Sequence, residues 1–222
     1  MSFRKTVLSG LLLSSSFFAA AQYNTLNEWY VGINGGASAS SIVLVPKLVD
    51  KFYSLGQTGG LVVRHLSESH FGFQVECNYL QAGWKEDYYG TKIWKNYTYS
   101  RQFGFVEVPV LAHLYAQSGA ASFYLHFGPS FSYYLDGTDV EENLSPEAFM
   151  QHGKFIEAPF QYGLTGGLGL EFKIGRTQVG LEGRYAYNLT NIFNDEVGED
   201  FVNSNLQLFT LRMHLLFNLS KK

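Results

Sequence analysis

The chain has 222 residues, a net charge of -3 and a charged fraction of 16%, below the roughly 25% of soluble domains. Near-neutral charge without a basic block excludes an electrostatic surface for nucleic acid. The single cysteine, Cys77, excludes disulfides and multi-thiolate metal sites within one chain. Aromatic residues make up 17% and glycines number 23, a composition that leaves room for a surface facing lipid.

Residues 1–21 predict a secretory signal peptide. A basic start at Arg4 and Lys5 precedes an apolar stretch and three alanines that end at Ala21, where cleavage is expected. The alternative, a retained anchor, conflicts with an apolar stretch that is short and interrupted by serines. The remaining residues, 22–222, match the size of one all-β domain. No later segment approaches 18 continuous apolar residues, so only a closed barrel could carry this part of the chain across a membrane.

Eight segments alternate apolar and polar side chains with the period of two that indicates β-strands. In chain order they cover about 29–38, 57–66, 71–84, 97–115, 122–135, 160–174, 178–189 and 206–219. The pattern breaks near Gly104, where Phe103 and Phe105 fall on the polar set. A bulge near Gly104 would reconcile the two halves of that strand.

The connections differ in length in a regular way. The short turns are 67–70, 117–121 and 175–176, and the long connections are 39–56, 85–96, 136–159 and 190–205. This sorting is typical of outer-membrane proteins and predicts an all-β fold: an eight-stranded antiparallel up-and-down transmembrane β-barrel with short periplasmic turns and long extracellular loops. A soluble lipocalin-like barrel would instead turn its apolar set inward. Alternation alone does not separate these two versions. The signal peptide, loop lengths, aromatic positions and single cysteine favour the membrane version.

Aromatic side chains are spaced to form two girdles at the membrane interfaces. Phe123 and Tyr133 are ten residues apart, as are Tyr162 and Phe172. At a 40° tilt ten steps rise roughly 25 Å, the height of a lipid-facing band. The predicted interface aromatics are Trp29, Trp84, Phe123, Tyr133, Tyr162, Phe172, Tyr187 and Phe217. Trp29, Trp84, Tyr133, Tyr162 and Tyr187, together with Tyr99, are assigned to the outer edge and the phenylalanines to the periplasmic edge. Outer-membrane lipid is the first expected partner.

The opposite face of the strands carries charges that a membrane barrel must bury in its lumen. These residues are Arg64, Glu76, Glu107, Glu171, Glu182, Arg184 and Arg212. Buried charges require partners, so we expect a structural salt-bridge network in which Glu182 and Arg184 lie beside Glu171 on one neighbouring strand and Arg212 on the other. Side chains should fill so narrow a lumen and leave no open pore. A proton path or small-ion site is the alternative use of these charges.

The chain offers little for catalysis. His65 and Ser67 are close in sequence but lie on the short-turn side, and their spacing does not indicate a hydrogen bond. The six histidines are scattered without paired ligand spacing. We therefore expect no catalytic, cofactor-binding or metal-binding residues. The alternative is a small-ligand-binding or lipid-modifying outer-membrane barrel.

Three segments resemble a known family. VEVPVLAHLY (106–115), FGPSFSYYL (127–135) and the stretch 162–193 are similar to the PorT-like outer-membrane β-barrel family of Bacteroidota-type bacteria. The resemblance implies an eight-stranded barrel located in the outer membrane, whose best-known member is an accessory of type IX secretion. These motifs identify a barrel and not a reaction. We therefore predict a non-enzymatic protein with a polar, side-chain-filled lumen and a structural or docking role, for instance as an accessory to secretion.

Two long loops, 39–56 and 136–159, are the expected docking surfaces for a secretion component or another surface protein, because the exposed rim of a barrel is where a partner can bind. The apolar content of the first loop could instead fold over the barrel mouth.

Overall fold

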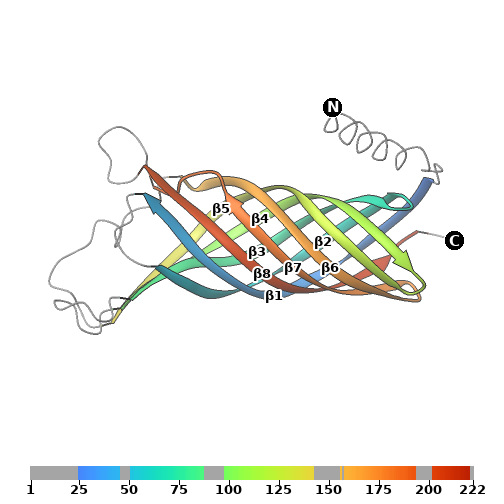
Figure 1. The fold of residues 1–222 in the computed structure, drawn as a ribbon, viewed down its shortest axis with the longest axis horizontal. Coiled ribbons are helices and arrows are strands. Elements are labelled where there is room, and N and C mark those ends of the chain that lie inside the picture. Colours follow the sequence, from blue (N-terminus) through green and yellow to red (C-terminus); the bar gives the residue numbers. More distant parts are fainter. Residues whose placement is uncertain are drawn as a thin grey trace, which may run out of the picture.

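The computed structural model describes residues 25–45, 51–87, 98–142, 156, 158–193 and 202–220. They form eight antiparallel strands that close into a barrel in sequential order (Figure 1). The strands are β1 (Thr25–Val45), β2 (Lys51–Glu68), β3 (Phe71–Asp87), β4 (Thr98–Ser118), β5 (Ala121–Glu142), β6 (Phe160–Ile174), β7 (Thr177–Asn188) and β8 (Asn203–Asn218). β1 pairs with β8 from Tyr30↔Asn218 to Val45↔Asn203, which confirms the predicted fold class.

Both described chain ends lie at the same end of the barrel as the three short turns (Figure 1). We call this the turn end and the opposite one the loop end. At the turn end, Gly119 and Gly175 have φ of 61° and 64°, the left-handed conformation that a tight hairpin requires and that glycine adopts without steric cost. The predicted turns at 117–121 and 175–176 are thus confirmed.

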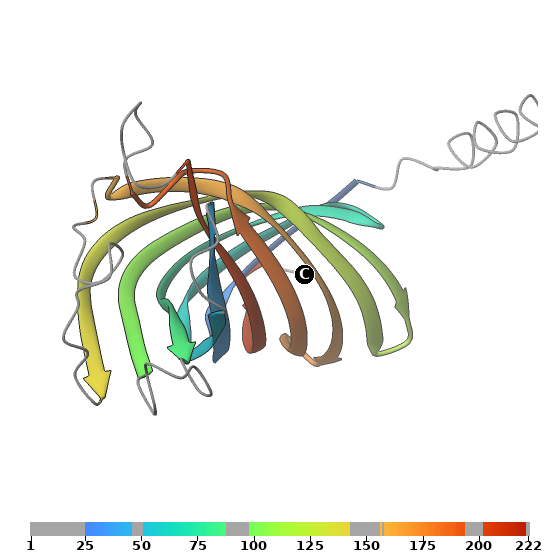
Figure 2. The ribbon, with the colours of Figure 1, turned by 60° about the vertical axis from the view of Figure 1, so that its left-hand side comes forward.

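Several strands extend further toward the loop end than the sequence predicted. The predicted loop 39–56 is wrong over most of its length, because Ala39 pairs with Leu55 and Ser40 with Ser54. The predicted loop 136–159 is likewise shortened, since β5 continues to Glu142 and pairs there with β4. Backbone pairing with a neighbouring strand extends these segments despite their polar residues. β5, at 22 residues, is about twice the roughly 9–11 residues that cross a membrane. The oblique view in Figure 2 shows β4 and β5 reaching toward the loop end.

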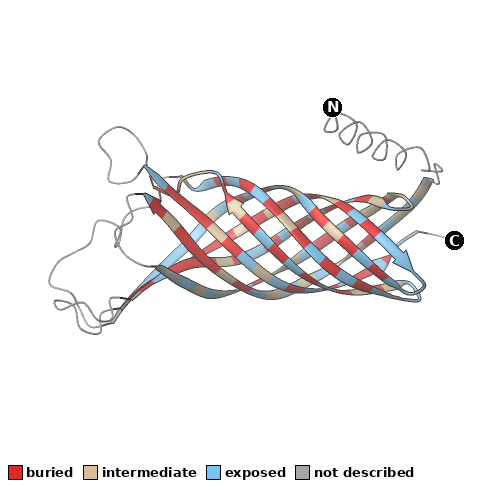
Figure 3. Ribbon diagram, viewed as in Figure 1, coloured by how far each residue is buried: buried red, intermediate tan, exposed pale blue. Residues whose placement is uncertain are grey.

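Side chains alternate between the inside and the outside along every strand, as the checkered burial in Figure 3 shows. Leu168, Leu181 and Leu215 are about half exposed on the outside, at 53%, 50% and 48%, whereas Glu171 and Arg212 are buried at 3% each. This orientation is the reverse of a lipocalin-like barrel. Cys77 faces outward among exposed apolar residues. None of the described residues lies in a helix long and apolar enough to cross a bilayer.

The irregularity near Gly104 differs from the prediction. A register shift does occur between Gly104 and Phe105, but the extra residue is Leu135 on β5. Inward alternation in β4 therefore continues unbroken, and Phe103 and Phe105 are buried inside. The apparent conflict in the sequence arose because the interior at the loop end is apolar rather than polar.

The interior consists of three layers along the barrel axis. At the loop end, aromatic and aliphatic side chains, among them Trp84, Phe103 and Leu206, form a hydrophobic cluster. A second cluster near the turn end includes Tyr30, Leu66 and Tyr124. Charged and amide side chains occupy the layer between them. The prediction of a polar lumen is therefore correct only for the middle of the barrel.

Inward-facing glycines on β6 and β7 make room for large side chains from neighbouring strands. A Cβ placed on Gly169 would meet the ring and hydroxyl of Tyr124, and one on Gly180 would meet the imidazole of His214. The glycine-rich stretch of β6 therefore serves interior packing, because one wall contributes no side chains where another wall projects a ring.

Replacing Gly169 with alanine should destabilise the barrel by about 1–3 kcal/mol, because the Tyr124 ring would be displaced in a filled interior. The matched control is Gly183→Ala on β7, where an added Cβ meets nothing within 4 Å. Urea unfolding in lipid vesicles would measure both variants. Equal stability of the two would show that Tyr124 does not need the space above Gly169.

Candidate functional site

The middle layer of the lumen is the most elaborate polar cluster in the described part of the chain. Its charged members are three arginines and four glutamates, which come from six of the eight strands. Arg64 is on β2, Glu76 on β3, Glu107 on β4, Glu171 on β6, Glu182 and Arg184 on β7, and Arg212 on β8, and all seven are buried. Their alternation with outward apolar residues directs them inward.

Glu76 is the centre of this layer. Its Oε1 lies 2.8 Å from Arg184 Nη2, and its Oε2 lies 2.7 Å from Arg212 Nη1. Gln74 and Asn78, which lie two residues before and two residues after Glu76 along β3, also donate hydrogen bonds to this carboxylate, at 2.6 and 2.8 Å. Arg212 Nη2 is 3.6 Å from Glu107 Oε2. One carboxylate thus links β3 with β7 and β8 across the lumen.

A second ion pair joins opposite walls nearer the turn end. Arg64 Nη1 on β2 lies 2.6 Å from Glu171 Oε2 on β6, and the same oxygen is 2.8 Å from His214 Nε2 on β8. Arg64 Nε donates to Gln74 Oε1 at 2.7 Å. Because Gln74 also donates to Glu76, the two ion-pair clusters form one continuous network.

Histidines extend the network toward β4 and β5. His113 Nδ1 and His126 Nε2 are 2.7 Å apart, and His126 Nδ1 is 3.1 Å from Glu182 Oε1. Arg184 Nε donates to the same Glu182 oxygen at 2.8 Å. The ring of Tyr124 lies 5.2 Å from that of His113 and 4.7 Å from that of His126. Every imidazole in this row is buried, so the network is shielded from bulk water.

The structure brings the seven predicted charges together, but mainly through partners other than those expected. Glu182 and Arg212 are direct neighbours in the register of β7 and β8, yet Arg212 is paired with Glu76. Glu171 is paired with Arg64 and not with Arg184. The predicted placement of Arg212 beside Glu182 is confirmed by the register, but the ion pairs of Arg212 and Glu171 run across the lumen, because long side chains can span so narrow an interior.

Other members of the interior were missed by sequence reasoning. Gln74 and Asn78 share the inward parity of Glu76 and complete the set of hydrogen-bond donors around its carboxylate. Arg101 lies at the loop end, where its guanidinium carbon is 5.1 Å from the centre of the Phe103 ring and its Nε is 2.9 Å from Asp139 Oδ1. The one sequence feature that indicated an inward position for Arg101 was that it lies on the same face of the strand as Phe103 and Phe105.

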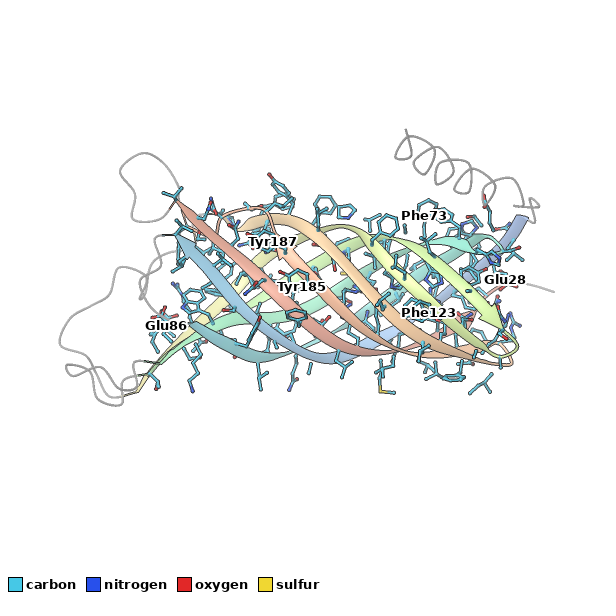
Figure 4. The ribbon with its side chains drawn as sticks, viewed as in Figure 1. Glu28, Phe73, Glu86, Phe123, Tyr185 and Tyr187 are labelled. Atoms are coloured by element: carbon cyan, nitrogen blue, oxygen red, sulfur yellow. The ribbon has the colours of Figure 1, made fainter. Side chains whose placement is uncertain are left out.

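Most of the predicted interface aromatics face outward. Phe123, Tyr133, Tyr162, Phe172 and Phe217 are about half exposed, and Tyr187 on β7 faces the same way (Figure 4).

The assignment of Trp84 to an interface is wrong. Its side chain is 0% exposed, and its Nε1 donates a hydrogen bond to Glu86 inside the barrel at the loop end. Tyr99 is also buried. Both belong to the apolar cluster that fills the interior there. Trp29 is exposed but lies at the turn end, opposite His65 in the β1–β2 register, so its assignment to the outer edge is wrong as well. Trp29 is near the start of β1. Because both described chain ends lie at the turn end, Trp29 lies there too.

The pair considered for catalysis does not form a site. His65 Nε2 is 3.1 Å from Asn27 Oδ1, while Ser67 Oγ donates to the backbone oxygen of Phe71. Across the residues that the structure describes, no group of three or more His, Cys, Asp or Glu side chains is arranged to hold a metal ion. The buried charges instead form internal pairs that hold opposite barrel walls together.

A closed eight-stranded barrel with an apolar outside and a paired, charged inside is the architecture of a small membrane barrel. Residues 20–194 match the model of a family described as the outer membrane protein beta-barrel domain. The chain belongs to this family. It is therefore a protein of the outer membrane.

Solved structures of outer-membrane proteins are similar to this chain at low sequence identity. The outer membrane protein AlkL, determined in lipid bilayers, is 10% identical with a TM-score of 0.51, and the match covers 91% of this chain and 94% of AlkL. Neisserial surface protein A is 12% identical (TM-score 0.48, covering 85% of this chain and 96% of that one). The outer membrane protein W of E. coli is 15% identical (TM-score 0.42, covering 85% and 98%). No curated protein matches the sequence.

Replacing Glu76 with glutamine should lower the free energy of unfolding by roughly 3 kcal/mol, because it leaves Arg184 and Arg212 buried without full compensation. Glu68→Gln, a partly exposed position at the turn end, is the control and should change little. Urea unfolding in vesicles is the measurement. A Glu76→Gln variant as stable as the control would mean that the ion pairs do not hold the walls together.

Proposed function

We propose that this protein is a closed, non-enzymatic outer-membrane barrel that acts as a structural or docking protein and presents its loop end to a protein partner outside the cell. The observation that supports this most directly is the layered filling of the lumen. Polar pairs in the middle and apolar clusters at both sides leave the barrel wall and rim as the surfaces available for interaction.

The loop end supports the proposal in a second way. Three residues from the long connections, Ile156, Ile192 and Phe193, are buried in the apolar cluster with Trp84. Ile192 N also donates to the backbone oxygen of Ser204 at 3.0 Å. The bases of two connections are thus anchored to the interior. A rim fixed in this way presents a defined surface, and preorganisation reduces the entropic cost of binding a partner.

The shape of the chain also supports docking at the loop end. The connections 143–159 and 189–202 are the longest between consecutive strands, and β4 and β5 carry the first of them beyond the rest of the rim. Asp136 and Asp139 are exposed on this extension, and Asp139 pairs with Arg101. The resemblance to the PorT-like family favours a component of a protein-secretion system as the partner, with the loop end extracellular and the turn end periplasmic.

The purified barrel should show no steady ion conductance after insertion into a planar bilayer, because its interior is filled by side chains. Arg184→Ala combined with Arg212→Ala serves as the comparison, since it removes two large side chains from the middle layer. A stable open channel in the wild-type protein would contradict the closed lumen and favour a transport function.

Docking can be tested by cross-linking in intact outer membranes, followed by purification through a tag at the C-terminus. We expect a protein partner that is lost when residues 143–155 are replaced by a short Gly-Ser linker. The same linker inserted after Gly119, at the turn end, is the matched control and should keep the partner. Heat-modifiable migration on a gel would show that both variants are folded. If no protein is captured and a sugar copurifies instead, the protein is a ligand-binding barrel.

A further inference from the structure

The outside of the barrel is not uniformly convex. Two adjoining hollows, of about 470 and 510 Å³, lie on the outward face of β5 to β8. They share Leu168 and Gly183 and so form one continuous furrow. Both volumes fall within the roughly 300–1,000 Å³ of small-molecule sites.

The furrow exists because two outward positions lack a side chain. Gly183 on β7 lies between Leu168 on β6 and Leu211 on β8 in the register, and Gly166 lies between Phe127 and Tyr185. The neighbouring outward residues are large and about half exposed. Two glycines in a wall of leucines and aromatics leave a depression whose floor is backbone.

The length of the furrow suits an extended chain. It runs from Val179 near the turn end to Tyr185 further up β7, and six residues at about 3.3 Å with a tilt near 40° rise roughly 15 Å. Phe123 and Phe172 border its lower end. Tyr185 and Phe209 border its upper end, with ring centres 4.7 Å apart. Figure 4 shows Phe123 nearer the turn end than Tyr185.

The chemistry of the lining selects the occupant. The side chains that face the furrow are aliphatic or aromatic. The two charged or titratable residues at its floor, His126 and Arg184, direct their polar groups into the lumen, where Glu182 and Glu76 bind them. Of the side chains that face the furrow, only Tyr185, at its upper end, carries a hydrogen-bonding group, so a sugar or peptide would leave most of its polar groups without partners there. The surface is also the one that an outer-membrane barrel turns to lipid.

We propose that the furrow is a binding site for one acyl chain of a membrane phospholipid. A chain held between Leu168 and Leu211, over Gly183, fills a gap that other side chains of the wall do not reach, and so gains contacts on three sides instead of one. This proposal depends on the membrane location of the barrel and not on a docking partner at the loop end.

The furrow can be filled without disturbing the fold. A Cβ added at Gly183 meets nothing within 4 Å, and one at Gly166 approaches only the backbone oxygen of His126, at 3.6 Å. Gly183→Leu is therefore the principal variant and Gly166→Leu the second. Gly35→Leu on β1 is the matched control, because it is also an outward glycine, its Cβ would approach only the Thr58 oxygen at 3.8 Å, and it lines neither hollow.

The experiment uses the full barrel reconstituted in dimyristoylphosphatidylcholine vesicles, extracted in mild detergent and analysed by native mass spectrometry. We expect the wild type and Gly35→Leu to retain a bound phospholipid, seen as a mass increase of one lipid, and Gly183→Leu and Gly166→Leu to lose it. Equal lipid retention by all four proteins would overturn the proposal. So would a wild-type dimer that becomes monomeric in Gly183→Leu, since the furrow would then be a protein interface. Heat-modifiable migration verifies folding of each variant.

Discussion

The structure depends on the need to satisfy every backbone hydrogen bond where no water is available. In a bilayer, strands achieve this only by closing into a ring, and here β1 and β8 complete the ring along 16 paired positions. Closing eight strands gives an interior just wide enough for side chains to fill. The charges on the inner face therefore cannot remain hydrated by bulk water and must find partners across the lumen.

This constraint explains why Glu76 has such a complete set of partners. A carboxylate that lost contact with water would be costly alone, and it is stabilised only when several donors surround it. Arg184, Arg212, Gln74 and Asn78 supply these donors from three strands. The ion pairs compensate the buried charges and also hold the barrel walls in a fixed orientation, because they connect strands that backbone hydrogen bonds do not connect directly.

The apolar layers at both sides of the charged layer have a different role. Trp84 and Phe103 exclude water at the loop end and form one apolar cluster with Ile192 at the base of a long connection. The barrel thereby separates a rigid scaffold from the connections between strands, which are the segments free to vary without cost to the fold. Its lipid-facing wall and its rim can accordingly serve different partners.

The sequence by itself determined the eight strands, the three tight turns and the placing of residues such as Leu168 and Arg184 on opposite faces of the wall, since alternation is a local property of the chain. It did not determine which charges pair, because Arg64 and Glu171 are 107 residues apart and meet only when the ring closes. It also misplaced Trp84, which was assigned to an interface girdle as an aromatic residue at the end of a predicted strand, although it has the inward parity of Glu76. Only the tertiary structure decided that this end of the lumen is apolar, because a narrow interior that holds large rings has no space left for water.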